Sequence, residues 1–134
     1  MQTIKVKTIV EGHVEGQCVV SQEPISFLGG VDPEKGVISD VKHPLFNKSI
    51  KDKIFVFPEA IGSTVGSYVI FGMKVNGVAP RGLIAIRAET IVVAGAILAD
   101  IPFVHNPSIN ILTKVKTGDI IEINTKKGEI IIKD

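Results

Sequence analysis

The sequence has little of what several common protein classes require. It contains no tryptophan, and aromatic residues make up only 5% of its 134 residues, so stacking platforms for single-stranded nucleic acid are not expected. Cys18 is its one cysteine, which excludes an internal disulfide and favours a reducing cytoplasm. An iron–sulfur cluster needs several thiolates, so this chain cannot hold one alone. The longest apolar run, residues 91–99, is far too short to span a membrane.

The sequence also has no excess of charge of either sign. Lys and Arg number 15 and Asp and Glu number 14, which gives a formal net charge of +1. Nucleic acids and anionic membrane surfaces both require clustered Lys and Arg, so neither is expected as a partner. Residues 1–16 alternate apolar and charged side chains and lack the unbroken apolar stretch of a signal peptide, which again indicates the cytoplasm.

The chain does contain enough apolar residues for a core. They make up 45% of the sequence, which suits one domain over residues 1–134. Period-two alternation over 3–7 and the segment 14–20 predict two strands near the N-terminus. Segments 119–124 and 129–132 flank a turn that ends in Gly128, and they predict a C-terminal hairpin.

The middle of the chain has a different pattern. Residues 53–57 and 83–86 are short apolar runs, typical of strands buried on both faces. Helical spacing of apolar residues over 65–76, followed by Gly77, predicts a helix. Residues 90–100 predict a second helix that is apolar nearly all round and therefore expected to be buried. The sequence thus predicts an α+β fold, with an antiparallel β part from both ends and an inserted β-α-β-α unit whose strands form a small parallel sheet.

A Gly-Ser-Thr turn joins the strand over 53–57 to the first helix. The backbone N–H groups of residues 63–66 would lack helical partners there, and the helix dipole adds positive charge, so the turn suits an anion. A Ser or Thr that merely caps the helix explains the same pattern without a ligand, and both interpretations stay open. The residues that offer hydroxyl groups or close backbone approach are Gly62, Ser63, Thr64, Gly66 and Ser67.

Other catalytic arrangements have less support in the sequence. The turn lacks the Gly-x-Ser-x-Gly spacing of a hydrolase elbow, and no pattern places a histidine beside Ser63. Gly29-Gly30 does not begin a dinucleotide-binding fingerprint and is expected to be a turn. No metal-ligand spacing is present. The three histidines, His13, His43 and His105, are expected on the surface or in loops.

Several blocks of the sequence resemble the swivel domain, or small subunit, of the aconitase X family. They run in order over nearly the whole chain and cover residues 25–32, 55–69 and 77–80, with a looser block over 89–102. The most specific is the Gly-Ser-Thr-Val-Gly-Ser-Tyr stretch at 62–68. The resemblance implies a swivelling β/β/α fold and a heterodimer with a large catalytic subunit. It also implies a four-iron four-sulfur cluster in that partner and no cofactor in this chain.

The resemblance also implies a reaction. The substrate would be a phosphorylated hydroxy acid, (R)-5-phosphomevalonate, which loses water to give trans-anhydromevalonate 5-phosphate in the archaeal mevalonate pathway. Ser63 would remove the proton α to the carboxylate, while the partner's iron acts as a Lewis acid on the leaving hydroxyl. Because serine is a weak base, it would need strongly positive surroundings. The residues expected to bind substrate are Gly62, Thr64, Gly66, Ser67, Gly29 and Gly30.

Two alternatives remain beside this hypothesis. The chain could be a non-catalytic subunit for anion binding or assembly, or a subunit of a related hydroxyproline dehydratase. Family members often carry a basic residue directly before the Gly-Ser pair, where this chain has Ile61, so Lys74, Arg81 or the partner would have to supply a cation. We expect the 29–30 loop and the Ser63 turn to share one concave face toward the partner.

Overall fold

Eight strands form one sheet in the computed structural model, which describes residues 1–133. Their order across the sheet is β1-β12-β11-β3-β7-β9-β10-β2. In chain order they are β1 (Gln2–Lys5), β2 (Lys7–Val10), β3 (His13–Val20), β7 (Ile54–Phe57), β9 (Gly82–Ala85), β10 (Phe103–His105), β11 (Ile120–Asn124) and β12 (Glu129–Lys133).

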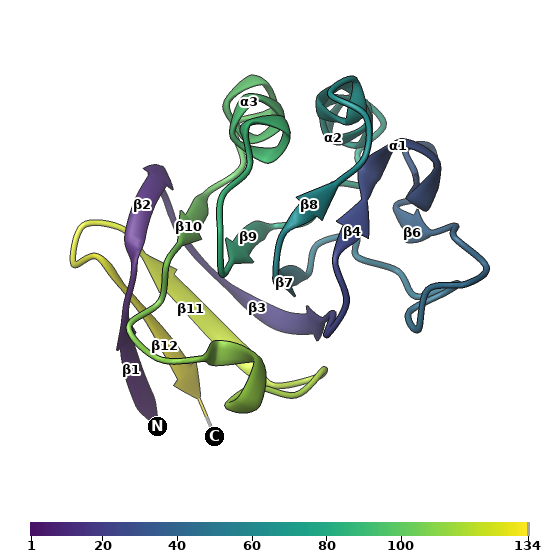
Figure 1. Ribbon diagram of the computed structural model, residues 1–134. Helices are drawn as coiled ribbons and strands as arrows, with labels where there is room; N and C mark the ends of the chain where they lie inside the picture. Colours follow the sequence, from purple (N-terminus) through teal and green to yellow (C-terminus); the bar gives the residue numbers. More distant parts are fainter. Residues whose placement is uncertain (134) are drawn as a thin grey trace.

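One bent segment supplies both edges of this sheet. Strand β1 pairs antiparallel with β12 at one edge, and β2 pairs antiparallel with β10 at the other. Only Val6 separates β1 from β2, and its N–H donates to the carbonyl oxygen of Gly128 at 3.0 Å. The sheet therefore curls back on itself like a barrel (Figure 1), and the strand predicted over 3–7 is divided at Val6.

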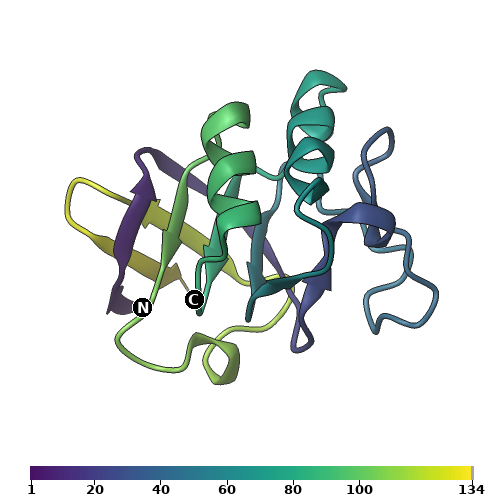
Figure 2. The same cartoon turned by 45° about the horizontal axis from the view of Figure 1, so that its top comes forward.

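The inserted unit is parallel, as the sequence predicted. Strands β3, β7, β9 and β10 pair in parallel, and right beside them lies the antiparallel part made from both chain ends. Helix α2 (Gly66–Val75) precedes β9, and helix α3 (Thr90–Ala99) connects β9 to β10. The two helices lie side by side on one face of the sheet (Figure 2). This confirms the α+β class and the β-α-β-α insert.

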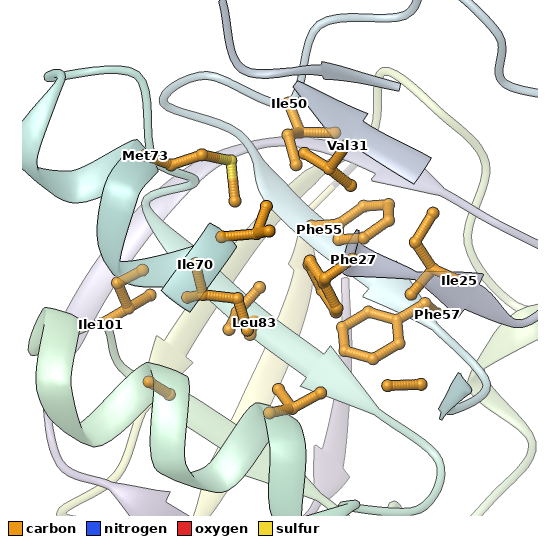
Figure 3. Close-up of a cluster of buried hydrophobic side chains, with 14 of the residues drawn as sticks. Ile25, Phe27, Val31, Ile50, Phe55, Phe57, Ile70, Met73, Leu83 and Ile101 are labelled. Atoms are coloured by element: carbon orange, nitrogen blue, oxygen red, sulfur yellow. The ribbon is translucent and has the colours of Figure 1, made fainter. Parts of the chain in front are cut away.

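Alternation along the parallel strands divides their side chains between two cores. On β7, Phe55 and Phe57 face the helices, while Ile54 and Val56 face the barrel interior, and all four are fully buried. Figure 3 shows the helix-side core, which contains Ile70 and Met73 of α2 together with the phenylalanine side chains. The rings of Phe55 and Phe57 stack with centroids 5.0 Å apart. Burial on both faces explains the continuous apolar runs in the sequence.

The segment before β7 is irregular but not free of structure. It contains short strands and one irregular turn of helix: β4 (Ile25–Ser26), α1 (Phe27–Gly30), β5 (Val31–Asp32) and β6 (Val37–Ile38). Another short strand, β8 (Ala60–Ile61), pairs in parallel with β4. A 3-10 turn, η1 (Ile111–Thr113), precedes the C-terminal hairpin. In the part of the chain that the structure describes, neither long helix approaches the length that a bilayer crossing would need.

The expectation that the second helix is buried all round was wrong. Helix α3 buries Val92 and Ala96 against the sheet, but Ile97 and Leu98 are 59% and 54% exposed. Apolar side chains on both sides of a helix do not distinguish a core position from a surface that another molecule covers.

Candidate active site at the start of helix α2

The Ser63 turn lies at the edge of the sheet where the parallel strands end. The chain leaves β7, forms β8, and reverses at Gly62 to enter α2. Gly62 has a φ of +93°, a conformation that only glycine adopts at little cost. In open parallel sheets, ligands bind at this carboxyl edge of the strands. Ser63 is exposed there, so its hydroxyl is accessible.

The start of α2 packs tightly against α1. A Cβ on Gly66 would lie 3.3 Å from the Cβ of Phe27 and 3.5 Å from the backbone nitrogen of Leu28. Gly29 follows directly, with a φ of +84°. The Gly29-Gly30 segment and the Ser63 turn are therefore neighbours, as expected.

Within residues 1–133, the shared surface lies outside four cavities of the molecule. These cavities have volumes of about 430 to 640 Å³, and their linings include neither Ser63 nor the α1 turn. Leu28, Ile61 and Val65, which flank the turn, are about half exposed. A second wall is needed to enclose anything bound at Ser63.

Ser63 itself occupies two of the backbone amides that the sequence analysis expected to be open. Its hydroxyl oxygen accepts from the Val65 N–H at 3.3 Å, and its carbonyl oxygen accepts from the Gly66 N–H at 3.0 Å. The Ser67 hydroxyl donates to the Thr64 carbonyl at 3.2 Å. Within residues 1–133, the amides of Ser63, Thr64 and Ser67 make no hydrogen bond. Three donors thus remain available at the helix start.

The cation near the turn is one that the sequence analysis missed. Arg87 follows β9, and its backbone N–H donates to the Pro58 carbonyl at 3.0 Å, just beyond the end of β7. Its guanidinium pairs with Glu89 at 2.8 Å and Glu59 at 3.0 Å. The hydrogen bond and charge of Glu89, with a contribution from Glu59, raise the pKa of Arg87. Arg87 could have been found from the sequence, because residues that follow adjacent parallel strands lie at the same edge of the sheet.

The two cations named from the sequence lie at the opposite edge. The Arg81 N–H donates to the Lys53 carbonyl at 2.8 Å, just before β7 begins, and Lys74 lies in the last turn of α2. At roughly 3.3 Å per residue, the length of β7 separates Arg81 from Arg87 by about 16 Å. Lys74 and Arg81 are therefore not the cation for Ser63.

His43 lies in a loop, as expected, but its side chain is buried. Its Nδ1 accepts from the Leu45 N–H at 3.0 Å, so Nε2 carries the proton and donates to the Ser21 hydroxyl oxygen at 3.2 Å. The Ser21 hydroxyl donates in turn to the Glu23 carbonyl. A histidine that donates to a serine cannot take that serine's proton. The pair is a structural connection, and it does not involve Ser63.

Residues 1–133 contain no group of three potential metal ligands from His, Cys, Asp and Glu. Cys18 is 1% exposed inside the barrel, where its thiol donates to the Lys116 carbonyl at 3.1 Å. Burial, with a smaller effect from Asp119, raises the pKa of the Cys18 thiol to about 11. Its thiolate, the form that binds metal, is therefore disfavoured at neutral pH.

Comparison with known proteins identifies the family. The model of the aconitase X swivel domain matches residues 3–132. The chain belongs to the aconitase X swivel-domain family. A solved relative of this swivel domain, the crystal structure of Thermococcus kodakaraensis aconitase X in its holo-form, is 45% identical with a TM-score of 0.94, and the match covers 100% of each chain.

Two curated relatives of this swivel domain have the same name. A protein of Thermococcus sibiricus is 47% identical over 98% of each chain, and one of Methanosarcina acetivorans is 45% identical over 95% of this chain and 88% of its own. Both are named phosphomevalonate dehydratase small subunit. The swivel domain therefore resembles these small subunits over essentially its full length.

Proposed function

We propose that this chain is the small subunit of phosphomevalonate dehydratase, a hydro-lyase, and that Ser63 is its catalytic base. The relatives named above support the subunit assignment, since each matches nearly the whole chain. The observation that carries the role of Ser63 is its position: an exposed hydroxyl at a helix start, on a surface that lacks a second wall. A small subunit implies a larger one, and that partner would supply the missing wall.

The proposed chemistry is the loss of water from (R)-5-phosphomevalonate. The deprotonated Ser63 oxygen takes the proton from the carbon α to the carboxylate, the electrons of that C–H bond form the new double bond, and the hydroxyl on the neighbouring carbon leaves as hydroxide. Release of the proton from Ser63 then completes the water molecule and restores the base. The Val65 N–H already points at the Ser63 oxygen and would stabilise negative charge on it. The helix dipole acts in the same direction.

Serine needs more positive charge than this chain offers. Arg87 is a cation at this edge, and two carboxylates already pair with it. We therefore propose that the partner provides the cations that lower the pKa of the Ser63 hydroxyl. The described residues do not fit a metal or cluster, so we assign the four-iron four-sulfur cluster to the partner, where it would supply Lewis acidity.

The remaining donors of the turn suit the anionic groups of the substrate. The open amides of Thr64 and Ser67 are the hydrogen-bond donors that we assign to substrate oxygens, as helix starts commonly bind phosphate or carboxylate. Gly66 and the Gly29-Gly30 segment border the same surface. The turn requires glycine at position 62 because its φ is positive, whether or not Gly62 contacts the substrate.

Two variants of Ser63 separate catalysis from helix capping. In the reconstituted complex, Ser63→Ala removes both the base and the acceptor for the Val65 N–H. Ser63→Asn removes the base but keeps an acceptor, because an Asn side chain forms the same local turn. If Ser63 is the base, both variants lose about a thousandfold or more in turnover. If it only caps the helix, Ser63→Asn remains active.

The controls address folding and substrate. Ser108→Ala makes the same change at another exposed serine and should leave turnover unchanged. Size-exclusion chromatography should show both Ser63 variants in the assembled complex. Turnover of a hydroxyproline in place of phosphomevalonate would assign the complex to the other dehydratase activity, and activity of this chain without a partner would contradict the proposal.

A further inference from the structure

The outer surface of the helix layer is apolar. On α2, the exposed residues Tyr68, Phe71 and Val75 follow one another at spacings of three and four, so they form one stripe that points away from the sheet. On α3, Ile97 and Leu98 are exposed on the same side of the layer. Because α2 and α3 lie side by side (Figure 2), these five residues form one surface, here named the apolar helix face.

The apolar helix face carries very little charge. Helix α3 contains no charged residue, and the single charged residue of α2 is Lys74. Helices that face water normally alternate an apolar stripe with a polar one, whereas here the stripe toward the core and the stripe toward solvent are both apolar. Tyr68 and Val75 are each 67% exposed and Ile97 is 59% exposed. Contiguous apolar surface of this kind marks an interface with another protein.

This face continues into the surroundings of Ser63. Val65 is 45% exposed between Ser63 and Tyr68, and Ile61 and Leu28 lie on the other sides of the turn. A partner that covers the Ser63 turn would first meet these apolar side chains. Tyr68 is the next exposed residue along α2, followed by Phe71 and Val75.

We propose that the apolar helix face is the docking surface for the large subunit, which meets it with a matching apolar surface. The inference rests on the proposed function, since that function requires a larger partner at Ser63. Continuity with the Ser63 turn argues for this occupant over a second copy of the chain. A second copy would bring only another Ser63 turn and, within residues 1–133, no group of metal ligands.

The test places charge on the face at positions far from Ser63. Val75 and Ile97 lie in the last turns of their helices, so Val75→Lys and Ile97→Lys put a positive charge where the helix dipole favours it. The isolated double variant should therefore melt within a few degrees of the wild-type chain. Thr3→Lys makes a similar change at an exposed position of β1, on the barrel side of the molecule. It serves as the matched control.

Two measurements on the full chain with purified large subunit decide the matter. Calorimetric titration should give a dissociation constant about a hundredfold higher for the double variant and an unchanged one for Thr3→Lys. Turnover measured against increasing small-subunit concentration should reach the wild-type maximum, but only at higher concentration. Ser63→Ala should do the opposite, with a lower maximum at an unchanged midpoint, so a failure of the docking surface and a failure of the catalytic role give different results.

Three results would overturn the inference. One is wild-type affinity of the double variant for the large subunit. Another is a wild-type chain that does not bind the large subunit at all. The third is a homodimer, seen by analytical ultracentrifugation of the isolated chain, that the lysine variant disrupts while its affinity for the large subunit stays unchanged.

Discussion

A Cβ atom on Gly62 would lie 2.6 Å from the hydroxyl oxygen of Ser26. Ser26 ends β4 and Gly62 directly follows β8, and Ser26 pairs with Ile61, the last residue of β8. The backbone of Gly62 thus passes too close to Ser26 for a larger residue, at the position where the chain reverses into α2. Ser26 therefore helps to determine the position of Ser63. The hydroxyl group of Ser26 is held in place by its hydrogen bond to the Leu28 carbonyl at 3.1 Å.

Gly62→Ala should disturb the turn for two separable reasons. A non-glycine residue at positive φ costs about 1–2 kcal/mol, and the clash with the Ser26 hydroxyl adds to it. We expect a lower midpoint in urea unfolding and at least a tenfold loss of turnover. In the double variant Ser26→Ala/Gly62→Ala the clash is relieved while the backbone strain persists, so stability should recover only in part. Full recovery, or no recovery, would show that one of the two causes is absent.

Gly95→Ala should weaken the contact between the two helices. A Cβ there would lie 2.7 Å from the Cδ1 and 2.9 Å from the Cβ of Ile70, and the latter atom cannot move without moving α2. Overpacking of this kind costs about 1–3 kcal/mol. Urea unfolding of the isolated chain measures it. Gly30→Ala is the matched control, because the new Cβ would be 3.7 Å or more from its neighbours and should cost much less.

Arg87→Gln should weaken substrate binding in the assembled enzyme. Its removal leaves Glu59 and Glu89 without their cation near the proposed anion site. We expect the KM for phosphomevalonate to rise by about threefold to tenfold as the local potential becomes negative. Lys74→Ala and Arg81→Ala, at the other edge of the sheet, should leave KM within twofold, on the order of the noise of such assays. A larger effect at Lys74 than at Arg87 would contradict this assignment of the edges.

Cys18 should make the chain less stable at alkaline pH. Burial, with Asp119, raises the pKa of its thiol from 9.0 to about 11. Above pH 9 the unfolded chain loses this proton while the folded chain keeps it, so the unfolded state is favoured as pH rises toward 11. The loss reaches roughly 2 kcal/mol. In urea unfolding, the stability difference between the wild type and Cys18→Ala should shrink over this range; a constant difference would rule out the linkage.

Elements with strong local patterns could be predicted from the sequence. The runs at 53–57 and 83–86 became buried strands, and Gly77 ends α2 with a φ of +71°. Strand β10 was not predicted, because it has only three residues, it follows Pro102, and its partners β2 and β9 are distant in the sequence. The division at Val6 was missed for the same reason, since closure of the sheet depends on partners more than 90 residues away.

Only those site residues were predictable whose position follows from a local turn in the sequence. Gly62 and Ser63 follow from a strand, a turn and a helix in succession, and the structure places them as that order implies. The occupied amides could not be foreseen, because they depend on the rotamer and carbonyl direction of Ser63. The prediction of a nearby cation failed because sequence proximity favoured Lys74, while the strand direction brings Arg87 to the edge where Ser63 lies.

The pairing of β1 with β12 places Gln2 opposite Ile132. The first and the last described strands therefore lie together on the barrel side, across the molecule from α2 (Figure 1). A short linker could join them, so a circularly permuted chain, opened in the irregular segment before β7, should keep every strand pairing. An affinity tag or a covalent fusion to another polypeptide at either end would likewise leave the start of α2 unobstructed.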